Sequence, residues 1–210
     1  MRIKWLGHAC FKITSKNGIR IVTDPFDDNV GYKLPKVSCD IVTTSHNHYD
    51  HNFTDCLSGD YTIVNKVGNF YIKDIAIRGV HTYHDEEQGA KRGDNIVYVF
   101  DVDGKKVCHL GDLGHRLTKA QIEMIGDVDV LLIPVGGVYT IDAEAARDVC
   151  ESLNAKVIIP MHYKTKPLKF ELNSVDKFLE YYPYTKLDKP FIEITEDMLK
   201  ERHIYVLNYE

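Results

Sequence analysis

The sequence lacks a long hydrophobic run. Its longest apolar stretch covers residues 130–135, far short of the roughly 18 residues that a membrane-spanning helix needs. The first residues lead into Gly7 and His8 without the apolar segment of about 7 to 15 residues that a secretion signal contains. We therefore expect no membrane span and a cytoplasmic protein.

Cysteine is scarce and poorly arranged for metal binding. The five cysteines are odd in number and widely spaced, and none forms a CxxC pair, which argues against a cysteine zinc site and favours reduced, buried thiols. The chain also lacks low-complexity stretches and linkers. With 210 residues, 44% hydrophobic and 27% charged, it predicts a single domain over residues 1–210.

No long block of positive charge is present. Twenty-six basic residues stand against 31 acidic ones, for a formal charge of −5. The electrostatic attraction that dominates nucleic-acid binding would have to come from a local patch. A small-molecule substrate is therefore favoured over nucleic acid, and a homo-oligomer stays open.

Hydrophobic patterning predicts an α/β protein. Two hairpins are expected, over residues 11–22 and 97–110, and near-continuous apolar runs predict strands covered on both faces at 40–45, 129–134 and 156–161. Helical spacing favours helices over 118–125 and 142–153, and a third helix from Asn173 or Ser174 through Tyr181. Closing strands at 191–194 and 204–207 flank a short helix at 196–201.

Histidine is the residue in excess, with ten in the chain, and residues 45–52 read SHNHYDHN. Because side chains alternate along extended backbone, His46, His48 and Asp50 can face one way and His51 another, so one segment can supply two metal ions. Imidazole and carboxylate ligands suit zinc, manganese or iron better than calcium or magnesium. A solvated histidine-rich loop is the plainer alternative.

More ligands are needed to close two sites, and other strand ends supply them. The candidates are His84 in HTYHDE, Asp112 in HLGDLG and His162 in PMHY. Each follows a strand-like run, which predicts that they meet at one edge of the sheets. His81 competes with His84 for one position, and we favour His84.

The order HNHYDH, HDE, LGD and PMH resembles the metallo-β-lactamase superfamily, whose motif HxHxDH precedes a His, an Asp and a His. Gly7-His8 and Thr23-Asp24-Pro25 resemble its opening segment, so the resemblance covers nearly the whole chain. The segments HDE…RGDN and CHLGDLGH are most similar to the branch of the ascorbate-6-phosphate lactonase and the N-acylphosphatidylethanolamine phospholipase.

This resemblance implies a four-layer αβ/βα sandwich with two mixed β-sheets flanked by helices. It also implies two divalent metal ions, zinc foremost, with manganese or iron as alternatives. It would assign the first ion to His46, His48 and His84, and the second ion to Asp50, His51 and His162. Asp112 would bridge the two ions. Asp24 and His8 would support the ligands from behind.

The implied activity is hydrolysis by a hydroxide that bridges the two ions, since a pair about 3.5 to 4 Å apart lowers the pKa of water towards about 7. Asp50 would orient the hydroxide and accept a proton, which makes Asp50 and Asp112 the expected catalytic residues. The expected substrate is an ester, lactone or phosphodiester of a small metabolite. His115, Arg92, Tyr139 and Tyr163 are candidate substrate contacts because of their positions on loops near these residues, and ordinary surface roles for Arg92 and His115 stay open.

Two alternatives stay open at this point. One is a phosphodiesterase or nuclease acting on nucleic acid, which would need a basic track along the cleft. The other is a metal-binding sensor or partner-regulated protein that holds metal without turnover.

Overall fold

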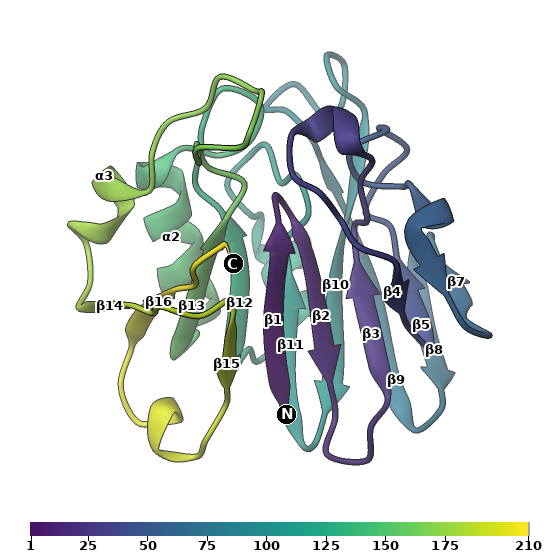
Figure 1. The fold of residues 1–210 in the computed structure, drawn as a ribbon. Coiled ribbons are helices and arrows are strands. Elements are labelled where there is room, and N and C mark those ends of the chain that lie inside the picture. The colour runs from purple at the N-terminus through teal and green to yellow at the C-terminus, as the bar shows by residue number, and fades with distance from the viewer. Residues whose placement is uncertain (210) are drawn as a thin grey trace.

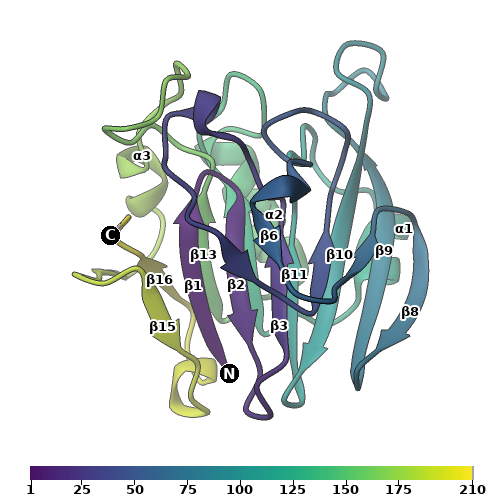
Figure 2. The ribbon, with the colours of Figure 1, turned by 45° about the vertical axis from the view of Figure 1, so that its right-hand side comes forward.

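The computed structural model describes residues 1–209, whose main feature is two β-sheets lying face to face (Figures 1 and 2). In spatial order, the six-stranded sheet contains β15 (Phe191–Glu193), β1 (Arg2–Gly7), β2 (Cys10–Thr14), β3 (Arg20–Thr23), β5 (Ile41–Thr43) and β7 (Thr62–Val64). The eight-stranded sheet contains β14 (Tyr184–Lys186), β16 (His203–Val206), β13 (Val157–Met161), β12 (Val130–Pro134), β11 (Lys105–His109), β10 (Asp94–Val102), β9 (Ile75–Tyr83) and β8 (Gly68–Ile72). Both sheets mix parallel and antiparallel pairs.

The main hydrophobic core fills the space between the two sheets. It joins Ile3 and Ile13 of the six-stranded sheet to Phe100 and Val107 of the other, and all four side chains are fully buried. Strands β12 and β13 are buried at every position, since they are covered on both faces. The continuous apolar runs at 129–134 and 156–161 are explained by this double burial, and both predicted hairpins are confirmed as the antiparallel pairs β2–β3 and β10–β11.

Three α-helices lie on the outer side of the eight-stranded sheet (Figures 1 and 2). They are α1 (Lys119–Ile125), packed on β9; α2 (Ala143–Leu153), packed on β12; and α3 (Asp176–Leu179), packed on α2. The first begins with a capping box between Thr118 and Gln121. The second begins where the Asp142 side chain accepts a hydrogen bond from the Ala145 N–H at 2.9 Å.

The outer face of the six-stranded sheet is covered by irregular segments. They are the 3₁₀ turns η1 (Asp28–Val30) and η2 (Thr54–Cys56) and the two-stranded sheet of β4 (Val37–Ser38) and β6 (Leu57–Ser58). A second apolar cluster, which includes Phe26 and Tyr32, packs them against Val22 and Val42. The α/β class and the two mixed sheets are therefore confirmed, with a covering layer on this side that contains no α-helix among residues 1–209.

The third predicted helix is much shorter than expected, because α3 makes only one turn. Neither Asn173 nor Ser174 is its N-cap residue, because the helix begins after Val175 and no side-chain hydrogen bond caps it. The chain then turns out of the helix where the Tyr181 N–H bonds Phe178 O, three residues back. The segment predicted as helix at 196–201 contains a 3₁₀ turn, η3 (Asp197–Leu199). Among the described residues, no helix combines the length and apolar character needed to cross a bilayer.

Candidate metal centre

The predicted site residues stand at the carboxyl ends of strands that run in one direction. In the six-stranded sheet, β1 and β3 are both antiparallel to β2, and β5 is parallel to β3. In the eight-stranded sheet, β9 and β11 are both antiparallel to β10. Strand β12 is parallel to both β11 and β13, so β13 has the same direction as β11. The residues that follow these strands are His8 (β1), Asp24 (β3), His46 (β5), His84 (β9), Asp112 (β11) and His162 (β13). The two sheets thus deliver them to one edge.

One carboxylate oxygen lies at the centre of the cluster. Asp112 Oδ2 is 3.1 Å from His84 Nε2, 3.2 Å from His51 Nε2 and 3.3 Å from His162 Nε2. His46 Nε2 lies at 3.9 Å from the same oxygen. Four imidazole nitrogens from three separate parts of the chain therefore surround Asp112, which is 2% exposed.

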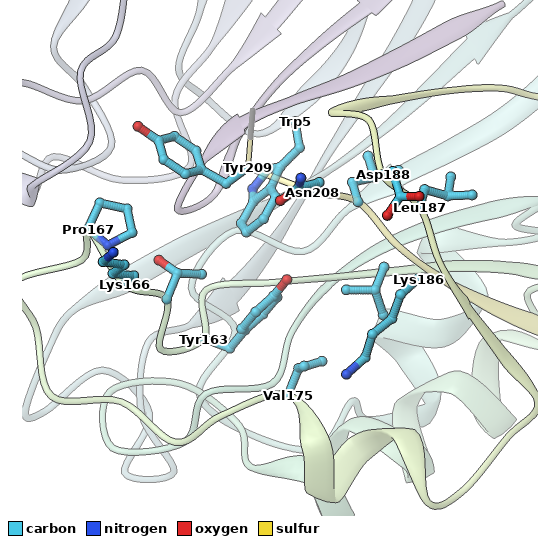
Figure 3. A pocket seen from close by; sticks show the side chains of 13 residues that line it. Trp5, Tyr163, Lys166, Pro167, Val175, Lys186, Leu187, Asp188, Asn208 and Tyr209 are labelled. Carbon is cyan, nitrogen blue, oxygen red and sulfur yellow. The ribbon is translucent and has the colours of Figure 1, made fainter.

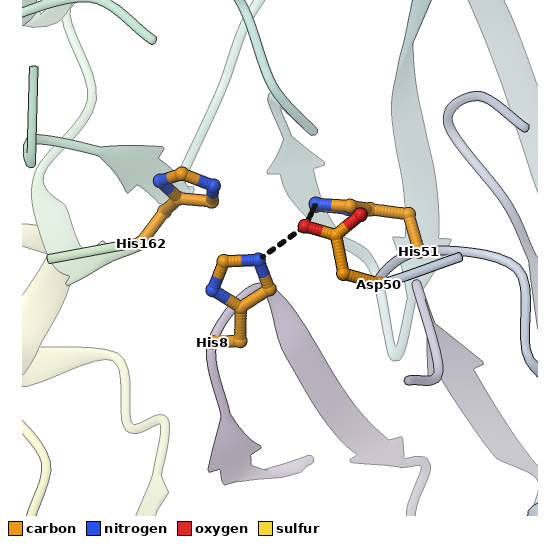
Figure 4. Close-up of side chains that lie close together, drawn as sticks. All are labelled: His8, Asp50, His51 and His162. Atoms are coloured by element: carbon orange, nitrogen blue, oxygen red, sulfur yellow. Dashed lines mark hydrogen bonds and ion pairs between the residues drawn. The ribbon is translucent and has the colours of Figure 1, made fainter. Parts of the chain in front are cut away.

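The ligand atoms fall into groups whose members lie within 4.8 Å of one another. One group contains His46, His48 and His84, and another contains His8, Asp50, His51 and His162 (Figure 4). A third joins Asp112 to His46 and His51. The structure thus brings together all seven residues expected to bind metal, and it adds His8 to the second group.

His8 contacts the second group directly instead of standing behind it. Its Nε2 lies 3.2 Å from Asp50 Oδ2, and its ring centroid lies 4.2 Å from that of His162 (Figure 4). Burial, followed by the nearby His162, lowers the pKa of His8 to about 4, so the ring is neutral at pH 7. A neutral His8 can orient Asp50 through this hydrogen bond or offer a nitrogen to a metal ion.

Asp24 fixes the histidine-rich loop at residues 45–52 through three hydrogen bonds. Its Oδ1 accepts the Ser45 N–H at 2.7 Å, and its Oδ2 accepts the Ser45 hydroxyl at 2.6 Å and His51 Nδ1 at 2.9 Å. This contact leaves His51 Nε2 facing Asp112. Burial alone would raise the pKa of Asp24, but His109 and His51 together lower it, so the carboxylate is ionised.

The cluster is built to stabilise positive charge. Burial alone would lower the pKa of His51, but the carboxylates of Asp112 and Asp24 raise it well above its usual value. His46 Nε2 and Asp112 Oδ1 are buried without a hydrogen-bond partner among the described residues. Buried polar atoms normally have partners, and nitrogen and oxygen donors converging in this way fit a divalent cation.

Two supporting residues escaped the sequence analysis. Buried Asn95 accepts the Asp112 N–H on Oδ1 at 2.9 Å and donates from Nδ2 to the Leu110 carbonyl at 3.0 Å, which fixes the turn that presents Asp112. Ser45 links Asp24 to His46, whose Nδ1 lies 2.9 Å from the Ser45 hydroxyl. In the sequence, Ser45 and Asn95 are polar residues close to apolar strand residues. This pattern alone does not distinguish a residue that supports a ligand from an ordinary turn residue.

Two glycines allow the loops to approach the ligands. A Cβ on Gly114 would lie 2.2 Å from the His84 carbonyl carbon, and a Cβ on Gly136 would lie 2.1 Å from the His162 carbonyl oxygen. Neither distance is compatible with a side chain, so these positions need glycine for space.

Gly114→Ala should therefore displace His84 and weaken metal binding by roughly 10- to 100-fold, an effect typical of disturbed ligand positioning. Metal titration of the purified variant measures this directly. As a control, Gly104→Ala has free space around the new Cβ but a φ of +74°, so it should cost about 1 kcal/mol of stability and leave metal affinity unchanged. Equal metal affinity for Gly114→Ala and the wild type would contradict the role given to this contact.

An open cleft of about 400 Å³ lies over the cluster. The residues that line it are His48, Tyr49, Asp50, His84, Arg92, Asp112, Tyr139, His162 and Phe170. Two of the four expected substrate contacts, Arg92 and Tyr139, are among them. Five of the proposed metal ligands, including both expected catalytic residues, thus face the same solvent-accessible space.

The other two expected substrate contacts do not line this cleft. His115 accepts the Tyr83 N–H at 3.1 Å and lies 2.7 Å from the Arg116 carbonyl through its second nitrogen, so it joins two loops. Tyr163 is buried, stacks on Trp5 with ring centroids 5.5 Å apart, and lines a different cavity of about 760 Å³ (Figure 3). His81, the alternative to His84, pairs with Asp94 at the surface.

A family model described as the beta-lactamase superfamily domain matches residues 2–162. The chain belongs to this superfamily. The match includes every residue of the cluster, from His8 to His162.

Similar proteins support the assignment. A metal-dependent hydrolase from Thermoplasma volcanium is 31% identical, over 81% of this chain and 90% of its own length. A solved structure from Thermotoga maritima, described as a zinc-dependent hydrolase of the metallo-beta-lactamase superfamily, is 47% identical with a TM-score of 0.84, covering 98% of this chain and 97% of that one. The prediction of a metal-dependent hydrolase is confirmed at the level of the family, while the lactonase and phospholipase branch stays a prediction.

Proposed function

We propose that this protein is a binuclear metal-dependent hydrolase that cleaves an ester, lactone or phosphodiester bond of a small molecule. The observation that supports this most strongly is the convergence of four imidazole nitrogens on Asp112 Oδ2 at the floor of an open cleft. Packing of the core does not require a carboxylate surrounded by four imidazoles at the floor of a cleft, so this arrangement supports a functional role.

In this proposal each ion has its own ligand set. The first would be held by His46, His48 and His84, the second by Asp50, His51 and His162, and Asp112 would serve both. Zinc is the preferred ion for these donors, with manganese or iron as alternatives. Two bound divalent ions would make a water molecule acidic enough to supply a nucleophile at neutral pH, and would stabilise negative charge on the substrate oxygen under attack.

The protein's own groups would position the reactants. Burial alone would raise the pKa of Asp50, but the hydrogen bond from His8 and the charge of His51 hold it below its usual range. Asp50 is therefore ionised at neutral pH, and its carboxylate can accept a hydrogen bond from a water molecule in the cleft and orient it. His8, in contact with Asp50 Oδ2 at 3.2 Å, would keep this carboxylate in one orientation.

The cleft favours a small substrate over nucleic acid. Its volume of about 400 Å³ falls within the range of about 300 to 1,000 Å³ typical of small-molecule sites. Among the described residues that line it, Arg92 is the single lysine or arginine. A nucleic-acid backbone requires a row of such charges.

The proposal is tested by assaying metal-free protein before and after reconstitution with zinc, manganese or iron. The panel contains a neutral ester, a lactone and bis(4-nitrophenyl) phosphate, with DNA and RNA oligonucleotides beside them. We expect turnover of at least one small substrate class, appearing only with metal and saturating at two ions per chain. Full loading without turnover would favour a metal-binding sensor, and faster cleavage of the oligonucleotides would favour a nuclease.

A further inference from the structure

Arg92 occupies a distinct position in the cleft. It lines the space above the cluster together with His84 and Asp112. Its guanidinium lies over the Tyr139 ring, with Cζ 5.5 Å from the centroid, and donates one hydrogen bond to the Val138 carbonyl at 3.2 Å. These two contacts hold the guanidinium plane at the wall of the cleft.

No carboxylate neutralises this guanidinium among residues 1–209. Neighbouring cations are paired, since Lys91 binds Glu87 and Arg116 binds Asp148, whereas Arg92 forms no ion pair. Arginine carries five N–H donors, and the Val138 carbonyl takes one of them. The others are available to an anion entering the cleft.

The backbone of Arg92 is fixed by the residue that follows His84. Asp85, which is 3% exposed, accepts four backbone N–H groups, from Glu87 at 2.8 Å, Gly89 at 2.9 Å, Lys91 at 3.0 Å and Arg92 at 2.7 Å. One carboxylate therefore ties the Arg92 backbone to the strand end that presents His84. An arginine held in this way loses little freedom when it binds a ligand.

We infer that Arg92 is the receptor for an anionic group of the substrate, a carboxylate or a phosphate, separate from the bond that is cleaved. This inference rests on the proposed function and narrows its substrate class. A guanidinium matches two oxygens of such a group with parallel hydrogen bonds. Tyr49, Tyr139 and Phe170 line the same cleft and supply apolar surface for the carbon skeleton between the anion and the scissile bond.

The first test compares esters that differ only in a terminal charge. 4-Nitrophenyl hexanoate is neutral, 4-nitrophenyl hydrogen adipate carries a carboxylate at the far end, and 4-nitrophenyl 5-phosphonopentanoate carries a phosphonate. Metal-loaded wild-type protein should prefer a charged ester, and Arg92→Met should lower the charged-to-neutral ratio of kcat/KM by about 10- to 100-fold. For Arg92→Lys, the charged-to-neutral ratio should lie between those of the wild type and Arg92→Met, because lysine keeps the positive charge but lacks the planar guanidinium.

Lys91→Met is the matched control, since it removes one positive charge from the adjacent residue, whose side chain pairs with Glu87 at the surface. It should leave the charged-to-neutral ratio unchanged. A ratio that falls equally in Lys91→Met and Arg92→Met would indicate a general field effect and would overturn the inference. The better of the two charged esters identifies whether carboxylate or phosphate is the preferred group.

A second measurement does not depend on turnover. In NMR spectra of the metal-free protein, the Arg92 Nε–H signal, assigned by its loss in Arg92→Lys, should shift on titration with inorganic phosphate. If that signal shifts and none of the esters, lactones or phosphodiesters tested is cleaved by the metal-loaded protein, the anion site stands and the proposed hydrolase function fails. If esters are cleaved with no charge preference and the signal does not move, the hydrolase stands and the role of Arg92 is overturned.

Discussion

Asp112→Ala should lose bound metal and show kcat/KM reduced by about a thousandfold, because metal catalysis contributes several kcal/mol to the transition state. In the wild-type protein, burial alone would raise the pKa of Asp112, but His162 and His51 hold it well below its usual range, so an anionic ligand is available at neutral pH. Its Oδ2 lies within 3.9 Å of four imidazole nitrogens. Elemental analysis and steady-state kinetics measure the two losses.

Two further variants make this prediction specific. Asp112→Asn keeps the size of the side chain and removes its charge, so it should resemble Asp112→Ala in metal content. Asp127→Ala removes a carboxylate from an exposed position between α1 and β12 and should retain full metal and activity. Two ions per chain in Asp112→Ala would show that Asp112 is not a ligand.

Asp24→Asn should weaken metal binding by roughly 10- to 100-fold although Asp24 does not face the cleft. The carboxylate accepts three hydrogen bonds on its two oxygens, two from Ser45 and one from His51. Asparagine keeps one oxygen and replaces the other with an NH2 donor, so it cannot accept on both sides. Loss of a buried acceptor should also lower the free energy of unfolding by about 1–3 kcal/mol. Metal titration and chemical denaturation of the metal-free protein measure these effects.

The loss of stability in Asp24→Asn should become smaller as the pH falls. The folded-state pKa of Asp24 is lowered, so its charge stabilises the fold above the unfolded-state pKa of about 3.9, and this stabilisation disappears as pH falls further. The difference between wild type and Asp24→Asn should therefore be largest near neutral pH and narrow below about pH 4. Ser45→Ala, which keeps the His51 contact, should show a smaller loss of metal affinity, and equal losses would contradict the role given to the Asp24–His51 bond.

The sequence predicted much of the site because strand ends leave a local signature. Apolar runs predicted β5 and β13, and the second hairpin predicted β11. Their polar successors His46, Asp112 and His162 could be placed at one sheet edge from the sequence alone. The choice of His84 over His81 rested on the family resemblance, since both follow the same run. Only the structure shows that His84 faces Asp112 while His81 pairs with Asp94.

Contacts across distant segments could not be predicted from local pattern. The direct contact of His8 with Asp50 joins residues 42 positions apart, and nothing near His8 in sequence indicates it. His115 and Tyr163 were expected at the cleft because they follow site residues, but the side chain of a loop residue can turn to either side of the loop. The single domain, the cytoplasmic location and the oligomeric state stay predictions.

The most direct test of the account is anomalous X-ray diffraction from crystals of the zinc-loaded protein. We expect two zinc peaks, one contacted by His46, His48 and His84 and the other by Asp50, His51 and His162, with Asp112 contacting both. A single peak, or two peaks of which neither contacts Asp112, would contradict it.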